Sequence, residues 1–221
     1  GIVMDTKGEV LQMLKKAVET WDMELVHEAS QNALSQGITP YEAIEKGLGK
    51  GMINISERFN EGLIFLPQVL AASKAMEEGM AVFEPFIGKD SPHTTKGNIV
   101  IGTVQGDVHE IGKHVVCAFL RGAGYSVFDL GRDVPPDDFL EAAKERNASI
   151  VAASALMTTT LIGQKKIVKC LKEEELNIKT LFGGACCTRK WVESIGGDEY
   201  CSCGSEVVEC VDRMLKFNKG D

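Results

Sequence analysis

The second half of the chain alternates short apolar runs with segments long enough to be helices. Its apolar runs are NIVIGTV (98–104), YSVFDL (125–130), SIVAASAL (149–156) and IKTLFGG (178–184), followed by a weaker run near 199–201. Such alternation is typical of a parallel sheet that is covered by helices on both faces. We therefore expect an α/β domain over residues 98–221, which ends in a helix at about 204–218.

The first half, residues 1–88, has a helical periodicity instead. Apolar residues recur three and four positions apart, and Gly37 suits the C-terminal cap of a helix. The tetrapeptide TPYE (39–42) has the pattern of a capping box with proline in the first turn. A further helix is expected to begin near Pro67. With short joints between them, these segments predict a four-helix bundle as a separate domain.

A polar stretch with glycine and proline, IGKDSPHTTKG (87–97), lies between the two halves. It predicts a linker at 89–97. His93 lies in this stretch without an acidic or cysteine neighbour, so we expect it to be solvated. A chain of 221 residues has room for two modest domains and a substantial core.

Charge and apolar content argue against several classes of protein. The formal net charge of −8 is unfavourable for a nucleic acid as the main partner. No apolar stretch approaches the roughly 20 residues needed to span a membrane, and no export signal is visible. Seven cysteines without a C-x-x-C pair are typical of reduced thiols, so we expect a cytoplasmic protein. Neither Cys186-Cys187 nor Cys201-x-Cys203 has the spacing of a zinc knuckle.

The loop QGDVHEIGKH (105–114) follows the first predicted strand, at the sheet edge where ligands bind in such folds. A phosphate-binding P-loop needs four residues between its glycines and a hydroxyl residue after its lysine, whereas a histidine follows Lys113 here. A zinc protease needs a second histidine four residues after the first, but His114 comes five residues after His109. The dinucleotide pattern G-x-G-x-x-G is absent after this strand.

A histidine two residues after an aspartate remains. In an extended loop these two side chains point the same way, so Asp107 can accept a hydrogen bond from one ring nitrogen of His109. The other ring nitrogen is then free to bind a partner. Gly112 would leave room for a bulky group beside the next helix. An aspartate that caps this helix, beside a surface histidine, fits the same spacing equally well.

The stretch GDVHEIGKHVV carries D-x-H-x-x-G, and here the sequence resembles the cobalamin-binding fold of methionine synthase and of the corrinoid proteins of methyltransferase systems. SALMTTTL (154–161) is similar to the S-x-L segment of that fold, and FGGA (182–185) is similar to its G-G. RFNEGLIFLPQVLAASKAMEEGM (58–80) resembles the helical cap of those methyl carriers. The resemblance covers about residues 8 to 218. It implies a four-helix bundle cap followed by a flavodoxin/Rossmann-like five-stranded parallel sheet flanked by helices, with cobalamin as cofactor.

The resemblance also implies a relay of three residues below the cobalt. Cobalamin would bind with its own base displaced, and His109 would take the lower axial position. Asp107 would orient this imidazole, and Thr160 would add a hydroxyl where methionine synthase has serine. Because methylcobalt(III) takes a lower ligand and cobalt(I) sheds it, such a relay can absorb a proton when the ligand leaves.

The other implied cofactor contacts fall into three groups. Residues of the first loop would lie beside the ring: Gly106, Val108, Ile111 and Gly112. Residues along the displaced nucleotide tail would be Ser154, Leu156 and Thr158, with Gly183 and Gly184 making room by their bare backbone and Tyr200 closing the pocket. Apolar residues of the helical cap would keep water from the cobalt, and this cap would have to move during turnover: Phe59, Leu66 and Val69.

The function implied by the resemblance is methyl transfer by a carrier that is not a complete enzyme. Cobalt(I) would take a methyl group from a donor held by a substrate-specific methyltransferase. Methylcobalamin would then pass it to a second methyltransferase, with tetrahydrofolate or a thiol cofactor as acceptor, and a reductive activase would be a third partner. Methanol, methylamines, betaines and aryl methyl ethers are all compatible donors.

Three alternatives compete with this interpretation. A cobalamin-responsive sensor would pair a similar fold with a DNA-binding helix-turn-helix, but the acidic N-terminal half has no basic recognition helix. A cobalamin subunit of a radical mutase would lack the helical cap. A flavodoxin-like interaction module would leave His109 without a role.

Overall fold

The computed structural model describes residues 3–87, 95–202 and 204–217. Its backbone contacts divide into two compact units, Gly1–Lys96 with Ala118–Tyr125 and Gly97–Cys117 with Ser126–Asp221. Most of the linker predicted at 89–97, including His93, lies outside the described residues. The domain boundaries predicted at 88 and 98 therefore stay a prediction.

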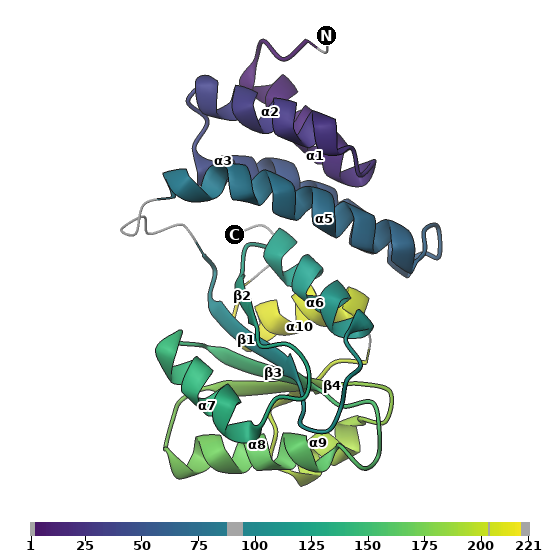
Figure 1. The fold of residues 1–221 in the computed structure, drawn as a ribbon, viewed down its shortest axis with the longest axis vertical. Coiled ribbons are helices and arrows are strands. Elements are labelled where there is room, and N and C mark those ends of the chain that lie inside the picture. Colours follow the sequence, from purple (N-terminus) through teal and green to yellow (C-terminus); the bar gives the residue numbers. More distant parts are fainter. Residues whose placement is uncertain (1–2, 88–94, 203, 218–221) are drawn as a thin grey trace. The chain divides into compact units, whose positions relative to one another are not determined.

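The described part of the N-terminal unit is helical. Its elements are α1 (Lys7–Glu19), α2 (Met23–Ser35), α3 (Pro40–Ala43), the π-helical turn η1 (Ile44–Leu48), α4 (Gly49–Asn60), α5 (Leu66–Phe83) and the 3-10 turn η2 (Glu84–Phe86). In Figure 1, α1 and α2 lie side by side, and α5 contacts both α2 and α4. Since α3, η1 and α4 follow one another without a break, residues 3–87 contain four helical rods, as the periodicity predicts.

Local signals explain where these helices begin. The Thr39 side chain accepts a hydrogen bond from the Glu42 amide at 3.2 Å, so Thr39 caps α3 as predicted from TPYE. The Glu42 carboxylate, expected to complete a capping box, pairs with Lys7 and Lys46. Asp22 caps α2 in the same way, through the Leu25 amide at 3.0 Å. Pro67 lies in the first turn of α5, where a missing amide proton costs nothing.

Two glycines let the helical rods approach closely. A Cβ atom on Gly47 would lie 2.8 Å from the Cβ of Leu14 in α1, and one on Gly51 would lie 2.7 Å from the Lys15 carbonyl oxygen. Both distances are too short for a real side chain. Small residues at these positions therefore bring η1 and α4 against α1.

The second unit is built on a parallel sheet of five strands, all within the described residues. The strands are β1 (Asn98–Thr103), β2 (Ser126–Asp129), β3 (Ile150–Ser154), β4 (Lys179–Gly183) and β5 (Glu199–Tyr200), in the order β2-β1-β3-β4-β5. Figure 1 shows α7 (Pro136–Glu145), α8 (Ile162–Glu173) and α9 (Arg189–Ser194) on one face. On the other face are α6 (Ile111–Gly122) and α10 (Val207–Met214), the latter preceded by the 3-10 turn η3 (Gly204–Glu206). The predicted fold class is confirmed, although the last helix is shorter than the predicted 204–218.

Strand order and register bring three loops together. Thr103 of β1 is paired with Ser154 of β3, and Ser154 is paired with Gly183 of β4. Because parallel strands end at the same edge, the loops that follow β1, β3 and β4 lie beside one another. β1 and β3 are also the strands between which the direction of the chain order reverses, which is the usual place for a ligand in such sheets.

Among the described residues, no helix combines the length and the apolar character that crossing a lipid bilayer would require.

Candidate functional site

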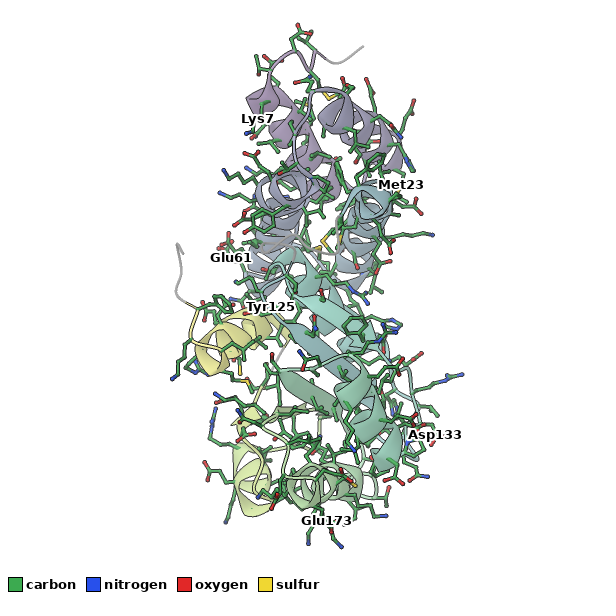
Figure 2. All side chains as sticks on the ribbon, turned by 90° about the vertical axis from the view of Figure 1, so that its left-hand side faces the viewer. Lys7, Met23, Glu61, Tyr125, Asp133 and Glu173 are labelled. Carbon is green, nitrogen blue, oxygen red and sulfur yellow. The ribbon has the colours of Figure 1, made fainter. Side chains whose placement is uncertain are left out.

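The loop after β1 is fastened to the loop after β2. It turns at Gly106, whose φ of +84° lies in the region that favours glycine. The Gly106 amide donates to Asp133 Oδ1 at 2.7 Å, and the Asp133 amide donates to the Asp107 carbonyl oxygen at 2.9 Å. Asp133 is labelled in Figure 2 on the α/β unit. These two bonds fix the backbone on either side of Asp107.

The Asp107 carboxylate is completely buried and joins two loops. Its Oδ1 accepts the His109 amide at 3.1 Å and lies 2.7 Å from His109 Nδ1. Its Oδ2 accepts the Leu156 amide and the Thr160 hydroxyl, each at 2.8 Å. The side chain of an aspartate beyond β1 thus holds the segment beyond β3.

Burial by itself would raise the pKa of Asp107. The hydrogen bonds from the Leu156 amide, from His109 and from Thr160 outweigh this effect and lower the pKa to about 2. Asp107 is therefore ionised at neutral pH. Since an ionised carboxylate only accepts hydrogen bonds, the proton of a neutral His109 ring lies on Nδ1 and the lone pair on Nε2.

The His109 side chain is half exposed, with 50% of its surface accessible. Its backbone is also fixed, because the hydroxyl of buried Thr103 donates to the His109 carbonyl oxygen at 2.9 Å. Thr103 belongs to no sequence motif, and the only signal for its role is a hydroxyl residue at the end of an apolar strand. A fixed backbone and a fixed Nδ1 leave Nε2 as the atom that His109 offers to a ligand. The described residues contain no group of three or more His, Cys, Asp or Glu side chains arranged to bind a metal ion.

Exposed apolar side chains occur next to this histidine in the sequence and in the segment that follows β3. Val108 is 57% exposed, Met157 in the loop after β3 is 37% exposed, and Ile162 at the start of α8 is 47% exposed. A Cβ atom on Gly112 would meet nothing within 4 Å. Val108 and Gly112 were expected from the sequence, but Met157 and Ile162 were not. Ile111 is the first residue of α6, and its side chain lies outside the described part of the structure.

The residues expected along a nucleotide tail lie at the ends of β3 and β4. Ser154 is the last residue of β3, and its Oγ is 3.4 Å from Thr103 Oγ1. Leu156 is half-buried and binds Asp107 through its amide, whereas Thr158 is exposed. Tyr200 ends β5 and borders a polar cavity of about 110 Å³ together with Arg189 and Cys201.

The two glycines at the end of β4, Gly183 and Gly184, lie close to neighbouring backbone. Gly184 has a φ of +118°, and a Cβ atom there would be 2.0 Å from the Ala155 carbonyl oxygen. A Cβ atom on Gly183 would be 3.0 Å from the Cys201 carbonyl oxygen. The fold itself thus demands bare backbone at Gly184, and a role of this pair in admitting a tail stays a prediction.

Gln164 of α8 links β3 and β4, a role that no sequence pattern predicted. Its amide nitrogen lies 3.1 Å from the carbonyl oxygens of both Ala153 and Gly183. Its carbonyl oxygen accepts the Trp191 ring N–H at 2.9 Å. The buried Gln164 side chain therefore ties the ends of both strands to α9.

The residues expected in an apolar cap belong to the N-terminal unit. Phe59 near the end of α4 and Leu66 at the start of α5 are half-buried, and Val69 is completely buried. The loop between these helices exposes two further apolar side chains that were not singled out, Leu63 and Phe65, each 67% exposed. The role of Phe59, Leu66 and Val69 as a lid over the cobalt stays a prediction.

Comparisons with known proteins agree on one family. Residues 97–206 match the B12 binding domain, and residues 10–84 match a second family with the same description. The chain is 45% identical to trimethylamine corrinoid protein 1 of Methanosarcina acetivorans and 43% identical to dimethylamine corrinoid protein 1 of the same organism. These matches cover 96% and 95% of this chain and 100% and 99% of the relatives.

A comparison with solved structures indicates the same family. A chain in the crystal structure of the methanol:cobalamin methyltransferase complex MtaBC from Methanosarcina barkeri matches with a TM-score of 0.86 and 31% identity. The match covers 96% of this chain and 82% of that one. The resemblance to corrinoid proteins is therefore confirmed, and the chain belongs to the corrinoid protein family, with a cobalamin-type corrinoid as its cofactor.

Proposed function

We propose that this corrinoid protein carries methyl groups in a methylamine methyltransferase system. Support comes from the two relatives named for trimethylamine and dimethylamine, at 45% and 43% identity. These nearly equal values favour methylamines as a class and do not choose between them. The similar chain from a methanol:cobalamin methyltransferase complex supports a methyltransferase as partner.

The exposure and chemistry of the residues near His109 in the chain suit a corrinoid ligand. The imidazole of His109 is half exposed, and Val108 next to it in the sequence is an exposed apolar residue. Met157, also exposed, follows Leu156, whose amide binds Asp107, and a Cβ atom on Gly112 would meet open space. A flat macrocycle needs such a combination of one axial donor atom and apolar contacts. When bound, the corrinoid supplies the cobalt that accepts and releases the methyl group.

Within the proposed site, the protein would orient the His109 imidazole and keep a proton on its Nδ1 atom. His109 would bind cobalt through Nε2, with the nucleotide base of the cofactor displaced. Asp107 keeps the ring in place and stays ionised, and Thr160 donates to the other carboxylate oxygen. If the imidazole took up a proton, the hydrogen-bonded chain of His109, Asp107 and Thr160 would hold it.

The remaining assignments are proposals of the same kind. The helical segment 1–88 would cap the upper face of the corrin ring, and residues 98–221 would bind the cofactor. A second methyltransferase that delivers the methyl group to tetrahydrofolate or a thiol cofactor, and a reductive activase, would be further partners. The cytoplasmic location expected from the cysteines also remains a prediction.

The contact between His109 Nδ1 and buried Asp107, at 2.7 Å, is the main support for His109 as the cobalt ligand. To test it, the apoprotein is loaded with hydroxocobalamin and visible spectra are recorded for wild type, His109→Ala and His27→Ala. His27 is an exposed histidine of α2 and serves as the control. We expect a base-off, imidazole-ligated spectrum in wild type and His27→Ala, and its loss in His109→Ala. Identical spectra for all three proteins would refute axial ligation by His109.

The methyl donor is tested separately. The reduced, loaded protein is mixed with its methyltransferase partner and with trimethylamine, dimethylamine, monomethylamine or methanol. We expect methylation of the cofactor from one of the amines and none from methanol. Methylation from methanol alone would overturn the assignment to methylamines.

A further inference from the structure

Two charged side chains are buried among the described residues, and they lie on either side of His109 in the sequence. One is Asp107, which contacts the imidazole directly. The other is Lys113, in the first turn of α6, whose side chain has no exposed surface. A buried ammonium group costs several kcal/mol unless neighbouring charges compensate it, so the position of Lys113 needs a reason.

Two carboxylates compensate the Lys113 charge. The Lys113 Nζ atom lies 2.7 Å from Asp129 Oδ1 and 3.2 Å from Glu110 Oε1. Asp129 is the last residue of β2, and its Oδ1 also accepts the Gly131 amide at 2.9 Å, which holds the carboxylate in place. Glu110 directly follows His109. The ammonium group therefore connects the residue next to the histidine with the end of strand β2.

The other contacts of this loop reach different strands. Thr103 at the end of β1 holds the His109 carbonyl oxygen, and Leu156 beyond β3 holds the Asp107 carboxylate. The Lys113–Asp129 pair adds a side-chain connection from the first turn of α6 to β2, the edge strand on the other side of β1. The segment around His109 is thus held from all three strands that surround it.

Stability alone does not account for this ion pair. Replacing a buried ion pair by apolar side chains of similar volume is often neutral or stabilising. An ion pair differs from apolar packing in demanding one geometry, because its charges must stay within hydrogen-bond distance. A pair of this kind is suited to fixing the direction in which α6 continues from the loop.

We propose that Lys113 is a positioning residue for His109. Its ion pair with Asp129 sets the angle at which α6 leaves the loop, and through Glu110 it fixes the backbone that carries the imidazole. The inference rests on the proposed function, since positioning matters only if His109 binds the cobalt. Lys113 acts through the chain and is not itself a ligand.

The test compares Lys113→Met, Asp129→Asn and the double variant with wild type, and Lys165→Met serves as a control. Lys165 is an exposed lysine of α8. Amide hydrogen exchange of the full-length apoprotein is measured first. We expect exchange in peptides covering 105–114 to rise about tenfold in Lys113→Met and Asp129→Asn, with no change in peptides from α8. The double variant should exceed Lys113→Met only slightly, because both changes break the same pair.

The same proteins are then loaded with hydroxocobalamin. We expect Lys113→Met and Asp129→Asn to show a smaller imidazole-ligated fraction than wild type, and Lys165→Met to match wild type. Asp129→Asn keeps an oxygen acceptor for Gly131 on a partly exposed side chain, so it provides the answer if Lys113→Met does not fold.

The two readouts separate the possible failures. Wild-type exchange over 105–114 together with an unchanged spectrum in Asp129→Asn would overturn the positioning role. Faster exchange in the variants, with no imidazole ligation even in wild type, would refute the proposed function and still support the fixing of the loop by Lys113. Equal effects of Lys165→Met would also overturn the inference.

Discussion

Thr160 and Asp107 are 53 residues apart in the sequence, yet the Thr160 hydroxyl donates to Asp107 Oδ2 at 2.8 Å. The same hydroxyl lies 3.0 Å from the Met157 carbonyl oxygen, so two acceptors compete for its one proton. An ionised carboxylate is the stronger acceptor, which directs the proton to Asp107. The hydroxyl therefore belongs to the same hydrogen-bonded chain as His109.

Replacing Thr160 by valine should remove this hydrogen bond without changing the shape of the side chain. A hydrogen bond to a buried charge is worth about 1.5–3 kcal/mol, so we expect the free energy of unfolding of the apoprotein to fall by that amount. Urea denaturation measures it. Thr160→Ser, which keeps the hydroxyl, is the control and should lose about 1 kcal/mol or less. Equal losses in both variants would mean that the hydroxyl contributes nothing.

The low pKa of Asp107 predicts a dependence of stability on pH. In the folded protein its pKa is about 2, against a usual value of 3.8, so the unfolded chain takes up this proton at higher pH. The group stabilises the fold above about pH 4, and this contribution of about 2 kcal/mol is lost as the pH falls from 4 towards 2. Urea denaturation of apo wild type and Asp107→Asn at several pH values should show their difference shrinking below pH 4. A difference that stays constant would contradict the assignment.

Gly184→Ala should destabilise the apoprotein. A Cβ atom would meet the Ala155 carbonyl oxygen at 2.0 Å, and the backbone has a φ of +118°. We expect a loss of about 2 kcal/mol or more in urea denaturation. Gly62→Ala is a suitable control, because Gly62 also has a positive φ, +75°, but a Cβ atom there would meet open space. If Gly184→Ala loses no more than Gly62→Ala, the close approach to Ala155 is unimportant.

Gly112→Ala should behave in the opposite way. A Cβ atom at this position in α6 meets nothing within 4 Å, and alanine is the better helix former by about 1 kcal/mol. The apoprotein should therefore be as stable as wild type or slightly more stable. If the open space receives the cofactor, the affinity for hydroxocobalamin should fall about tenfold, a modest overpacking penalty. Equilibrium titration measures it, and an unchanged affinity would place the cofactor away from Gly112.

Gln164→Leu tests the link between β3 and β4. The change leaves the Trp191 ring N–H without its acceptor and takes the amide nitrogen away from the Ala153 and Gly183 carbonyl oxygens. We expect a loss of about 2–4 kcal/mol and a shift in tryptophan fluorescence. Gln164→Glu keeps the acceptor for Trp191 but places a buried carboxylate oxygen against both carbonyl oxygens, so it should lose at least as much stability. A stable Gln164→Leu would show that the link is dispensable.

Much of the fold follows from local patterns. The apolar runs at 98–104 and 178–184 become β1 (Asn98–Thr103) and β4 (Lys179–Gly183), because a buried parallel strand needs a continuous apolar segment. TPYE begins α3 because its threonine caps the first free amide groups. The weak run near 199–201 yields only the two-residue strand β5. Short strands carry little periodicity, so their extent depends on pairing with a neighbour.

Only part of the site could be predicted from the sequence. Asp107 and His109 are two residues apart, and a local rule is enough to place their side chains together. Thr160 came from the resemblance to a family, since spacing says nothing about residues so distant. Gln164 and Lys113 gave no signal, because glutamine and lysine on a helix are usually solvated.

The sequence by itself determined the helical and α/β halves and the aspartate–histidine pair, because periodicity, capping and i, i+2 spacing act between near neighbours. Tertiary structure alone decided that the Asp107 carboxylate meets the Leu156 amide, and that Lys113 is buried against Asp129. Those partners lie on different strands and loops. Only the strand order β2-β1-β3 and its register bring them within hydrogen-bond distance.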